Sequence, residues 1–160
     1  PVRYFLIQPF YVKGASMEPN FVDHEYLVID ELSWRFRSPV RGEIAVFKYP
    51  KDPSQYFIKR VVGLSGETVK IENGQIYIYN EEKPEGFLLQ EPYLENIRTD
   101  RSGTTKVGSD EYFVMGDNRS SSLDSRFFGP VSKSAFVGRV WLRGWPIERW
   151  KIFNPPQYSL

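Results

Sequence analysis

Short runs of alternating apolar and polar residues, separated by turn residues, make up most of this 160-residue chain. A period of two is typical of half-buried β-strands, because successive side chains of a strand point to opposite faces. No long segment repeats apolar residues with the period of a helix, and at most one helical turn fits near Ser132–Phe136. The pattern predicts a mainly β fold with Greek-key or barrel-like connections. The predicted strands are Tyr4–Ile7, Tyr11–Lys13, Tyr26–Asp30, Glu43–Tyr49, Gln55–Val62, Thr68–Glu72, Gln75–Tyr79, Glu111–Met115 and Phe136–Arg143.

The composition of the chain changes between residues 73 and 109, where Glu, Asn, Gly and polar loops become frequent. Asn73-Gly74, at the start of this stretch, separates two alternating runs and is a strong hairpin signal. We interpret 73–109 as an inserted subdomain or long excursion, 1–72 and 110–154 as a catalytic β core, and 155–160 as a C-terminal tail. The alternative is that 73–109 is a set of ordinary long loops.

Charge and composition exclude several classes of function. The formal net charge is +1, so no basic field points to a nucleic-acid partner. The chain has no cysteine and one histidine, so we expect no disulfide, no metal site and no metal cofactor. No apolar run is long enough to span a bilayer. Because the chain enters a predicted strand directly from Pro1, we expect that a preceding segment is absent from it.

The segment KGASMEPNF, residues 13–21, has the features of a presented nucleophile. Small residues, Gly14 and Ala15, precede Ser16, and Pro19 restricts the backbone after it. A serine hydroxyl needs a base to attack a carbonyl carbon. The candidates are a carboxylate, a lysine, or His24, which lies in a polar turn typical of a solvated histidine.

The segment QYFIKRVVG offers the lysine. Lys59 and Arg60 are adjacent, so they point to opposite faces of the predicted strand, and at least one of them enters apolar surroundings or a cleft. A lysine in such a place can act as a base when desolvation lowers its pKa. The other interpretation is an edge strand whose long side chains reach water.

The segment VMGDNRSSSLDSRFFGP, residues 114–130, follows a predicted strand and is dense in short polar residues. Such a loop is held by its own hydrogen bonds, although a well-capped surface turn has the same composition.

Together, these segments resemble bacterial type I signal peptidases, the serine–lysine leader peptidases. GASMEPNF is similar to their nucleophile box, RGEIAVFKYP to the strand that follows it, YFIKRVVGLSGETV to the lysine box, and GDNRSSSLDSRFFG to their Gly-Asp-Asn box. The four blocks occur in the family's order.

The resemblance implies an antiparallel β-sheet or barrel core with an inserted β-rich subdomain, and it assigns roles to residues. Ser16 is then the nucleophile, Lys59 the general base, and Ser122 the serine that orients the lysine. The backbone N–H of Ser16 holds the oxyanion; a second donor used by some members falls at Gly14, which has no hydroxyl. Asp124 and Arg126 form a supporting ion pair with Asp117 beside them. The residues at the substrate pockets are Phe10, Val12, Met17, Phe21 and Ile58, all of which also suit a core.

The resemblance also implies a function and a place in the cell. The chain is expected to be a serine endopeptidase, without a cofactor, that removes signal peptides from preproteins after small residues of the Ala-x-Ala type, through an acyl-enzyme. It is expected at the extracytoplasmic face of the cell membrane, with an N-terminal transmembrane anchor absent from this chain. Two alternatives stay open: a self-cleaving protease domain like that of SOS-response repressors, and a non-catalytic β-barrel binding module.

Aromatic residues with basic neighbours suggest a lipid bilayer interface as a further partner. Aromatic residues make up 16% of the chain, and Trp141, Trp145 and Trp150 alternate with arginines and a lysine near the C-terminus. Such rings are frequent at the level of lipid headgroups. We expect Trp34 and Phe36 of the segment LSWRF to share this surface. Core tryptophans, or stacking on single-stranded nucleic acid, are the alternatives.

Overall fold

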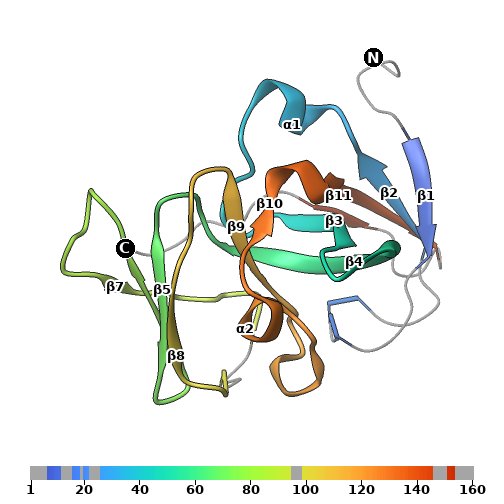
Figure 1. Cartoon of the computed structure of the whole chain (residues 1–160). Helices are drawn as coiled ribbons and strands as arrows, with labels where there is room; N and C mark the ends of the chain where they lie inside the picture. Colours follow the sequence, from blue (N-terminus) through green and yellow to red (C-terminus); the bar gives the residue numbers. More distant parts are fainter. Residues whose placement is uncertain are drawn as a thin grey trace.

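The computed structural model describes residues 7–11, 16–18, 20–21, 26–94, 99–145 and 151–153, and of 7–11 and 142–145 the backbone alone. The described strands form two antiparallel sheets (Figure 1). The larger sheet has eight strands. Their order is β1 (Ile7–Tyr11), β2 (Tyr26–Asp30), β11 (Phe136–Trp145), β3 (Ile44–Tyr49), β4 (Asp52–Gly63), β9 (Glu111–Met115) and β10 (Val131–Ser132), and β12 (Lys151–Ile152) pairs with β11.

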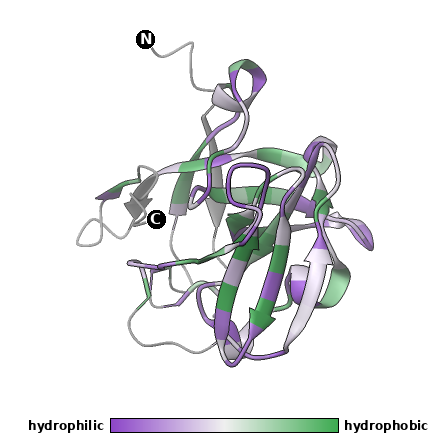
Figure 2. Cartoon of the chain, turned by 90° about the vertical axis from the view of Figure 1, so that its left-hand side faces the viewer, coloured by the Kyte–Doolittle hydropathy of each residue, from purple (hydrophilic) through white to green (hydrophobic). Residues whose placement is uncertain are grey.

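The smaller sheet has four strands, in the order β7 (Phe87–Leu88), β6 (Gln75–Tyr79), β5 (Thr68–Glu72) and β8 (Gly103–Lys106). Hydrophobic and hydrophilic residues alternate along β5 and β6 (Figure 2). Asn73 and Gly74 join β5 to β6 with positive φ angles of 53° and 77°, as a two-residue hairpin requires. The predicted hairpin is therefore confirmed.

Both sheets contribute to one of the hydrophobic clusters. Val62 and Met115 from the larger sheet pack with Val69 and Ile78 from the smaller one. The strands of the smaller sheet span 68–106, so β5 lies before the start of the predicted insertion at residue 73. The division into a core and an insertion stays a prediction.

Short helical segments lie between the strands: α1 (Ser33–Phe36), η2 (Arg119–Ser121), α2 (Ser125–Phe128) and η3 (Lys133–Ala135). The η3 turn agrees with the helical turn predicted near residues 132–136. The pattern did not predict α1, because a single turn is too short to show a helical period. Asp30 Oδ1 accepts hydrogen bonds from the backbone N–H groups of Leu32 and Ser33, both at 3.0 Å, and so fixes the chain into this turn.

The N-terminal strand corrects one expectation. The sequence predicted two strands, 4–7 and 11–13, with a break around Pro9, whereas β1 runs through Pro9, which lies opposite Val28. A proline has no N–H to donate to a neighbouring strand, but β1 is at an edge of the larger sheet, where the loss is tolerated.

Candidate active site

The nucleophile candidate Ser16 lies in a turn that is attached to the core on both sides. Its neighbour Met17 and the nearby Phe21 are buried in the cluster under β2, β3 and β4. Phe21 N–H donates to the Met17 carbonyl at 2.8 Å, which closes the turn. Asn118, in the loop after β9, donates its backbone N–H to the Ser16 carbonyl at 2.8 Å. The turn therefore presents Ser16 from a fixed backbone.

Lys59 lies on the central strand β4, and the structure brings it to Ser16. Its Nζ is 2.7 Å from Ser16 Oγ, although the two residues are 43 positions apart in the sequence. The side chain is enclosed, with 5% of the residue exposed. Because β4 pairs with β3 on one side and β9 on the other, the alternative of an edge strand does not hold.

The surroundings of Lys59 make it a base near neutral pH. Burial lowers the pKa of the Lys59 ammonium group from 10.5 to about 8, because a buried charge loses its hydration. Asp124 and Asp117 counteract part of this effect by attracting the ammonium, and Arg126 adds to it by repulsion. A measurable fraction of Lys59 is therefore neutral at pH 7 and able to accept a proton from Ser16.

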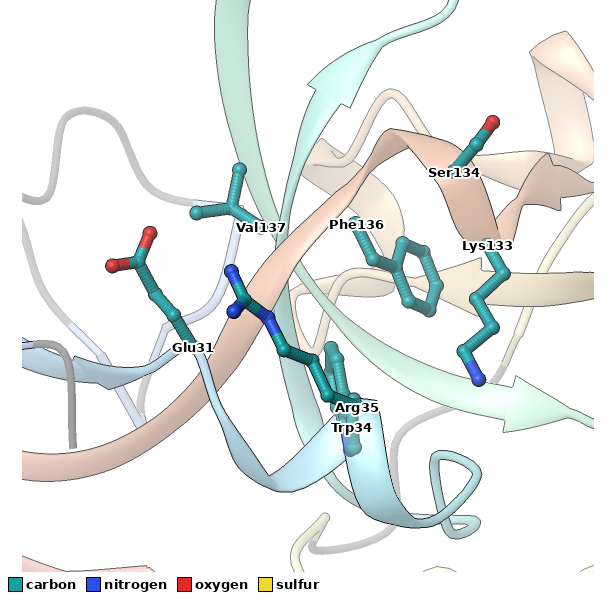
Figure 3. Close-up of a pocket in the computed structure, with 7 residues that line it drawn as sticks. All are labelled: Glu31, Trp34, Arg35, Lys133, Ser134, Phe136 and Val137. Atoms are coloured by element: carbon teal, nitrogen blue, oxygen red, sulfur yellow. The ribbon is translucent and has the colours of Figure 1, made fainter. Parts of the chain in front are cut away.

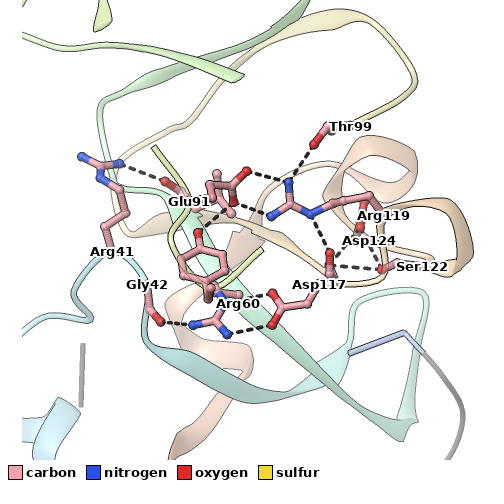
Figure 4. A network of polar contacts seen from close by, with 12 residues as sticks. Arg41, Gly42, Arg60, Glu91, Thr99, Asp117, Arg119, Ser122 and Asp124 are labelled. Atoms are coloured by element: carbon pink, nitrogen blue, oxygen red, sulfur yellow. Dashed lines mark hydrogen bonds and ion pairs between the residues drawn. The ribbon is translucent and has the colours of Figure 1, made fainter. Parts of the chain in front are cut away.

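The opposite face of β4 carries a second buried cation, Arg60. Its guanidinium donates to both carboxylate oxygens of Asp117, at 2.8 and 2.7 Å, and to the Gly42 carbonyl at 2.9 Å (Figure 4). The sequence analysis predicted that at least one of Lys59 and Arg60 is buried, and in the structure both are. The arginine is tolerated because a carboxylate neutralises it and its donors are hydrogen-bonded.

The loop after β9 arranges the remaining predicted residues. Asp124 is fully buried and forms an ion pair with Arg126, with 2.9 Å between Nε and Oδ1. Ser122 is buried; its hydroxyl donates to Asp124 Oδ2 at 2.8 Å and accepts from the Gly116 N–H at 3.1 Å. These hydrogen bonds hold Ser122 in one place, while its orienting role towards Lys59 stays a prediction.

A glycine is needed at position 116 for steric reasons. A Cβ atom there would lie 2.1 Å from Ser122 Oγ and 2.6 Å from the Ser16 carbonyl oxygen. These distances are far below van der Waals contact. Gly116 therefore allows the nucleophile turn and the loop after β9 to approach each other closely.

The predicted pocket residues are only partly described. Met17, Phe21 and Ile58 belong to the same buried cluster, so the structure places them in the core beside the turn that carries Ser16, and their role as pocket walls stays a prediction. Of Phe10 the structure describes the backbone alone, and Val12 lies outside the described residues. Gly14 and His24 lie outside them as well.

Trp34 corrects the expected aromatic surface. It is 7% exposed, its ring packs on Phe136 with 5.3 Å between centroids, and its Nε1 donates to Glu43 Oε1. It is a core residue, because a helical turn orients it inward, while Phe36 of the same turn is 83% exposed. Trp141 is partly buried; the side chain of Trp145 and all of Trp150 lie outside the described part.

A surface pocket of about 310 Å³ lies beside α1 (Figure 3). It is lined by Glu31, Trp34, Arg35, Lys133, Ser134, Phe136 and Val137.

Among the described residues, no cluster of His, Cys, Asp and Glu side chains could hold a metal ion. In the same part of the chain, no helix has the length and apolar character to cross a membrane.

Sequence reasoning missed the polar contacts that support this site from the segment between β7 and β8. Asn20 Nδ2 donates to Asp117 Oδ2 at 2.7 Å and to the Tyr93 carbonyl at 3.1 Å. Arg119, fully buried, forms an ion pair with Glu91. The only sequence signal was the arginine in the Gly-Asp-Asn box, since a buried arginine needs a partner; nothing in the sequence identified that partner as Glu91.

Comparison with known proteins identifies the family. The model of the family described as signal peptidase, peptidase S26, matches residues 1–145. The chain belongs to this family. Signal peptidase I of Leptolyngbya laminosa is 36% identical over 163 residues, which cover 97% of this chain and 77% of the relative. Probable signal peptidase I-2 of Synechocystis is 36% identical over 153 residues, covering 92% of this chain and 67% of the relative.

A solved structure agrees with the fold of this signal peptidase. The crystal structure of a signal peptidase I from Enterococcus faecalis V583 aligns with a TM-score of 0.55 and 32% sequence identity, covering 64% of this chain and 97% of that one. The predicted family and the mainly β, antiparallel fold are confirmed.

Proposed function

We propose that Ser16 and Lys59 form the catalytic dyad of this enzyme, a serine endopeptidase that removes signal peptides from preproteins. The observation that carries the proposal is the 2.7 Å distance between Lys59 Nζ and Ser16 Oγ in an enclosed site. Nucleophile and base must lie within hydrogen-bond reach for proton transfer, and these two do. No cofactor is needed for this chemistry.

The reaction begins with neutral Lys59. It takes the proton of Ser16 Oγ as the oxygen attacks the scissile carbonyl carbon, and a tetrahedral intermediate forms. The ammonium of Lys59 then donates that proton to the leaving amine of the mature protein, and an acyl-enzyme with the signal peptide remains on Ser16. Lys59 next activates a water molecule, which hydrolyses the ester and restores the free serine.

The oxyanion of the tetrahedral intermediate needs donors beside Ser16. We assign the first donor to the backbone N–H of Ser16 itself. A single such donor contributes about 3 kcal/mol in the transition state. The backbone of the turn is fixed by the Asn118 N–H and by the Phe21–Met17 hydrogen bond, so this donor is positioned before substrate arrives.

Ser122 is assigned to the positioning of Lys59. Its side chain is buried, and Asp124 and Gly116 fix its hydroxyl by hydrogen bonds. The Coulombic effect of Asp124 on Lys59 supports the proximity of this loop to the base. The Asp124–Arg126 ion pair holds the loop in place.

Small residues next to the cleavage site are the proposed specificity. Met17 follows Ser16 directly in the chain and Ile58 precedes Lys59, and both side chains are buried in one apolar cluster, so bulky apolar groups lie immediately beside the dyad and leave little room for a large substrate side chain. Phe10, Val12 and Phe21 are assigned to the same walls. The substrate would bind as an extended strand, which gives main-chain affinity and leaves alternate side chains to the pockets.

The enzyme acts on signal peptides at the membrane, and we place it at the extracytoplasmic face with α1 in contact with the lipid bilayer interface. The support is the exposed ring of Phe36, which follows Arg35 in α1, and the basic side chains of Arg35 and Lys133, which line the pocket in Figure 3. An apolar ring enters the interface, while each basic residue near anionic lipid contributes about 1 kcal/mol. Glu31 in the same pocket opposes part of that attraction.

Cleavage in trans tests the function directly. The purified chain in detergent is given a preprotein and a peptide with an Ala-x-Ala site, and the products are identified by mass. We expect cleavage after the second Ala, and no cleavage by Ser16→Ala or Lys59→Ala with unchanged folding. His24→Ala serves as the control and should cleave like the wild type. Full activity in Lys59→Ala, or loss of activity in His24→Ala, would exclude the dyad.

A further inference from the structure

The turn formed by residues 91–94 lies between β7 and β8 of the smaller sheet and contacts the catalytic segments. It is anchored by Leu89, whose backbone N–H donates to the Ile76 carbonyl at 2.8 Å and whose side chain is buried with the smaller sheet. The Leu94 N–H donates to the Glu91 carbonyl at 3.0 Å and closes the turn. The turn is thus tied to the smaller sheet by hydrogen bonding and packing of the preceding residues.

Glu91 holds the loop after β9 through Arg119. The guanidinium of Arg119 donates to Glu91 Oε1 at 2.9 Å and to Thr99 Oγ1 at 2.8 Å, and its Nε donates to the Gly116 carbonyl at 2.7 Å (Figure 4). Gly116 is the residue packed between Ser122 and the Ser16 carbonyl. A displacement of Arg119 would therefore move the backbone on which both serines rest.

Tyr93 reaches the nucleophile turn from the other side. Its carbonyl accepts from Asn20 Nδ2 at 3.1 Å, and the same Asn20 amide donates to Asp117. Its ring lies over the Arg60 guanidinium, 3.7 Å from the centroid, and so covers the partner of Asp117. Its hydroxyl donates to Glu91 Oε2 at 2.8 Å, so the residue that holds Arg119 and the residue that holds Asn20 are hydrogen-bonded to each other.

We propose that Glu91 and Tyr93 are positioning residues for the dyad, which hold the nucleophile turn and the loop after β9 in register. This inference rests on the proposed function of Ser16 and Lys59. Neither residue touches the reacting atoms. They act because a displacement of about 1 Å in a reacting group costs on the order of 100-fold in rate.

The first test replaces Glu91 by glutamine, which keeps the length of the side chain. The amide nitrogen of glutamine cannot accept a hydrogen bond, so one N–H of the Arg119 guanidinium loses its acceptor. Glu85→Gln, at an exposed position of the same region, is the matched control for the loss of one carboxylate. kcat and KM are measured on the Ala-x-Ala peptide and divided by the folded fraction from urea unfolding.

We expect kcat of Glu91→Gln to fall by about tenfold or more with KM within about twofold, because Glu91 contacts Arg119 and Tyr93 and none of the proposed pocket residues. The acid limb of the pH–rate profile should move to higher pH, since a looser site hydrates Lys59 and raises its pKa. Glu91→Asp, which keeps the charge, should recover part of kcat. Tyr93→Phe, which loses only the hydroxyl, should show a smaller loss of kcat and keep its fold.

Wild-type kcat and an unmoved acid limb in folded Glu91→Gln would overturn the positioning role while leaving the dyad intact. A decrease in kcat no larger than that of the control Glu85→Gln would overturn the positioning role as well. If Glu91→Gln does not fold, Tyr93→Phe decides: kcat equal to the wild type per folded molecule contradicts the proposal. Absence of cleavage by the wild type itself overturns the proposed function and this inference with it.

Discussion

Replacement of Lys59 by methionine removes a cation that the fold keeps away from water, and it should make the protein more stable at neutral pH. The pKa of Lys59 is about 8 in the folded protein and 10.5 as the reference value for the unfolded chain. Between these values the unfolded chain binds more protons than the folded one, so the stability of the wild type rises as pH increases from about 8 to about 10.5. Below pH 8 the full cost of the buried ammonium is present.

The magnitude follows from the pKa difference. A shift from 10.5 to about 8 corresponds to about 3 kcal/mol, at about 1.4 kcal/mol per pKa unit. Methionine has a similar length and fits apolar surroundings, so it leaves little cavity. The lost hydrogen bond between Lys59 and Ser16 subtracts about 1 kcal/mol. We therefore expect Lys59→Met to be about 2 kcal/mol more stable than the wild type at pH 7.

The assay is urea unfolding of both proteins at several pH values from 7 to 11. The stability advantage of Lys59→Met should decrease as pH rises above about 8, and above about pH 10.5 the variant should be less stable than the wild type by about 1 kcal/mol, the contribution of the lost hydrogen bond. Lys106→Met, on an exposed position of β8, is the matched control and should change stability by less than about 0.5 kcal/mol at every pH. In the wild type, kcat/KM should rise with an acid limb near pH 8, because only neutral Lys59 can accept the serine proton.

Two results would contradict the desolvation of Lys59. If Lys59→Met is less stable than the wild type at pH 7, the ammonium is not desolvated and the burial argument is wrong. If the acid limb of kcat/KM lies near 10, Lys59 titrates like a solvated lysine and the enclosure of its side chain has no catalytic consequence.

Three other predictions concern separate parts of the molecule. Ser122→Ala should lower kcat by at least about tenfold, whereas Ser121→Ala, at an exposed position, should be nearly silent; equal effects would leave the loop only a structural role. Glu43→Gln should lose about 1–3 kcal/mol at pH 7. Burial raises the pKa of Glu43, but the hydrogen bond with Arg37 and the other partners lower it below its usual value, so the loss should shrink as pH falls through that lowered pKa. Urea unfolding of both proteins at pH 7 and pH 3 measures the loss, and a loss of equal size at the two pH values would contradict this explanation. Phe36→Ser should weaken co-sedimentation with anionic vesicles, whereas Trp34→Phe should not, and unchanged binding by Phe36→Ser would remove α1 from the interface.

Most strands could be predicted from the sequence because each depends on local alternation. The runs 26–30, 68–72, 75–79 and 111–115 have the bounds of β2, β5, β6 and β9. The Asn73-Gly74 turn was predictable for the same reason, since its positive φ angles are a property of those two residues. The α1 turn and the continuity of β1 through Pro9 were not, because they depend on Asp30 and on the edge position of the strand.

The catalytic residues could also be predicted only in part from the sequence. Ser16 and Lys59 could be named as candidates from the sequence because one lies among small residues and the other beside a second cation on one strand, and the family resemblance then assigned them the roles of nucleophile and base. That pattern could not tell which cation enters the apolar surroundings. Both do, and only the structure supplies the carboxylate of Asp117 that makes the second burial tolerable.

The sequence alone was enough to give the positions of most of the longer strands along the chain and the type of each reactive side chain, since both are encoded within a few neighbouring residues. Only the tertiary structure decided the distance between Ser16 and Lys59, the dehydration of the lysine, and the contacts of Glu91 and Tyr93 with the catalytic segments. The physical reason is that hydrogen bonds and desolvation depend on distance in space. The segments concerned are brought together by sheet pairing and core packing, whose partners no local pattern specifies.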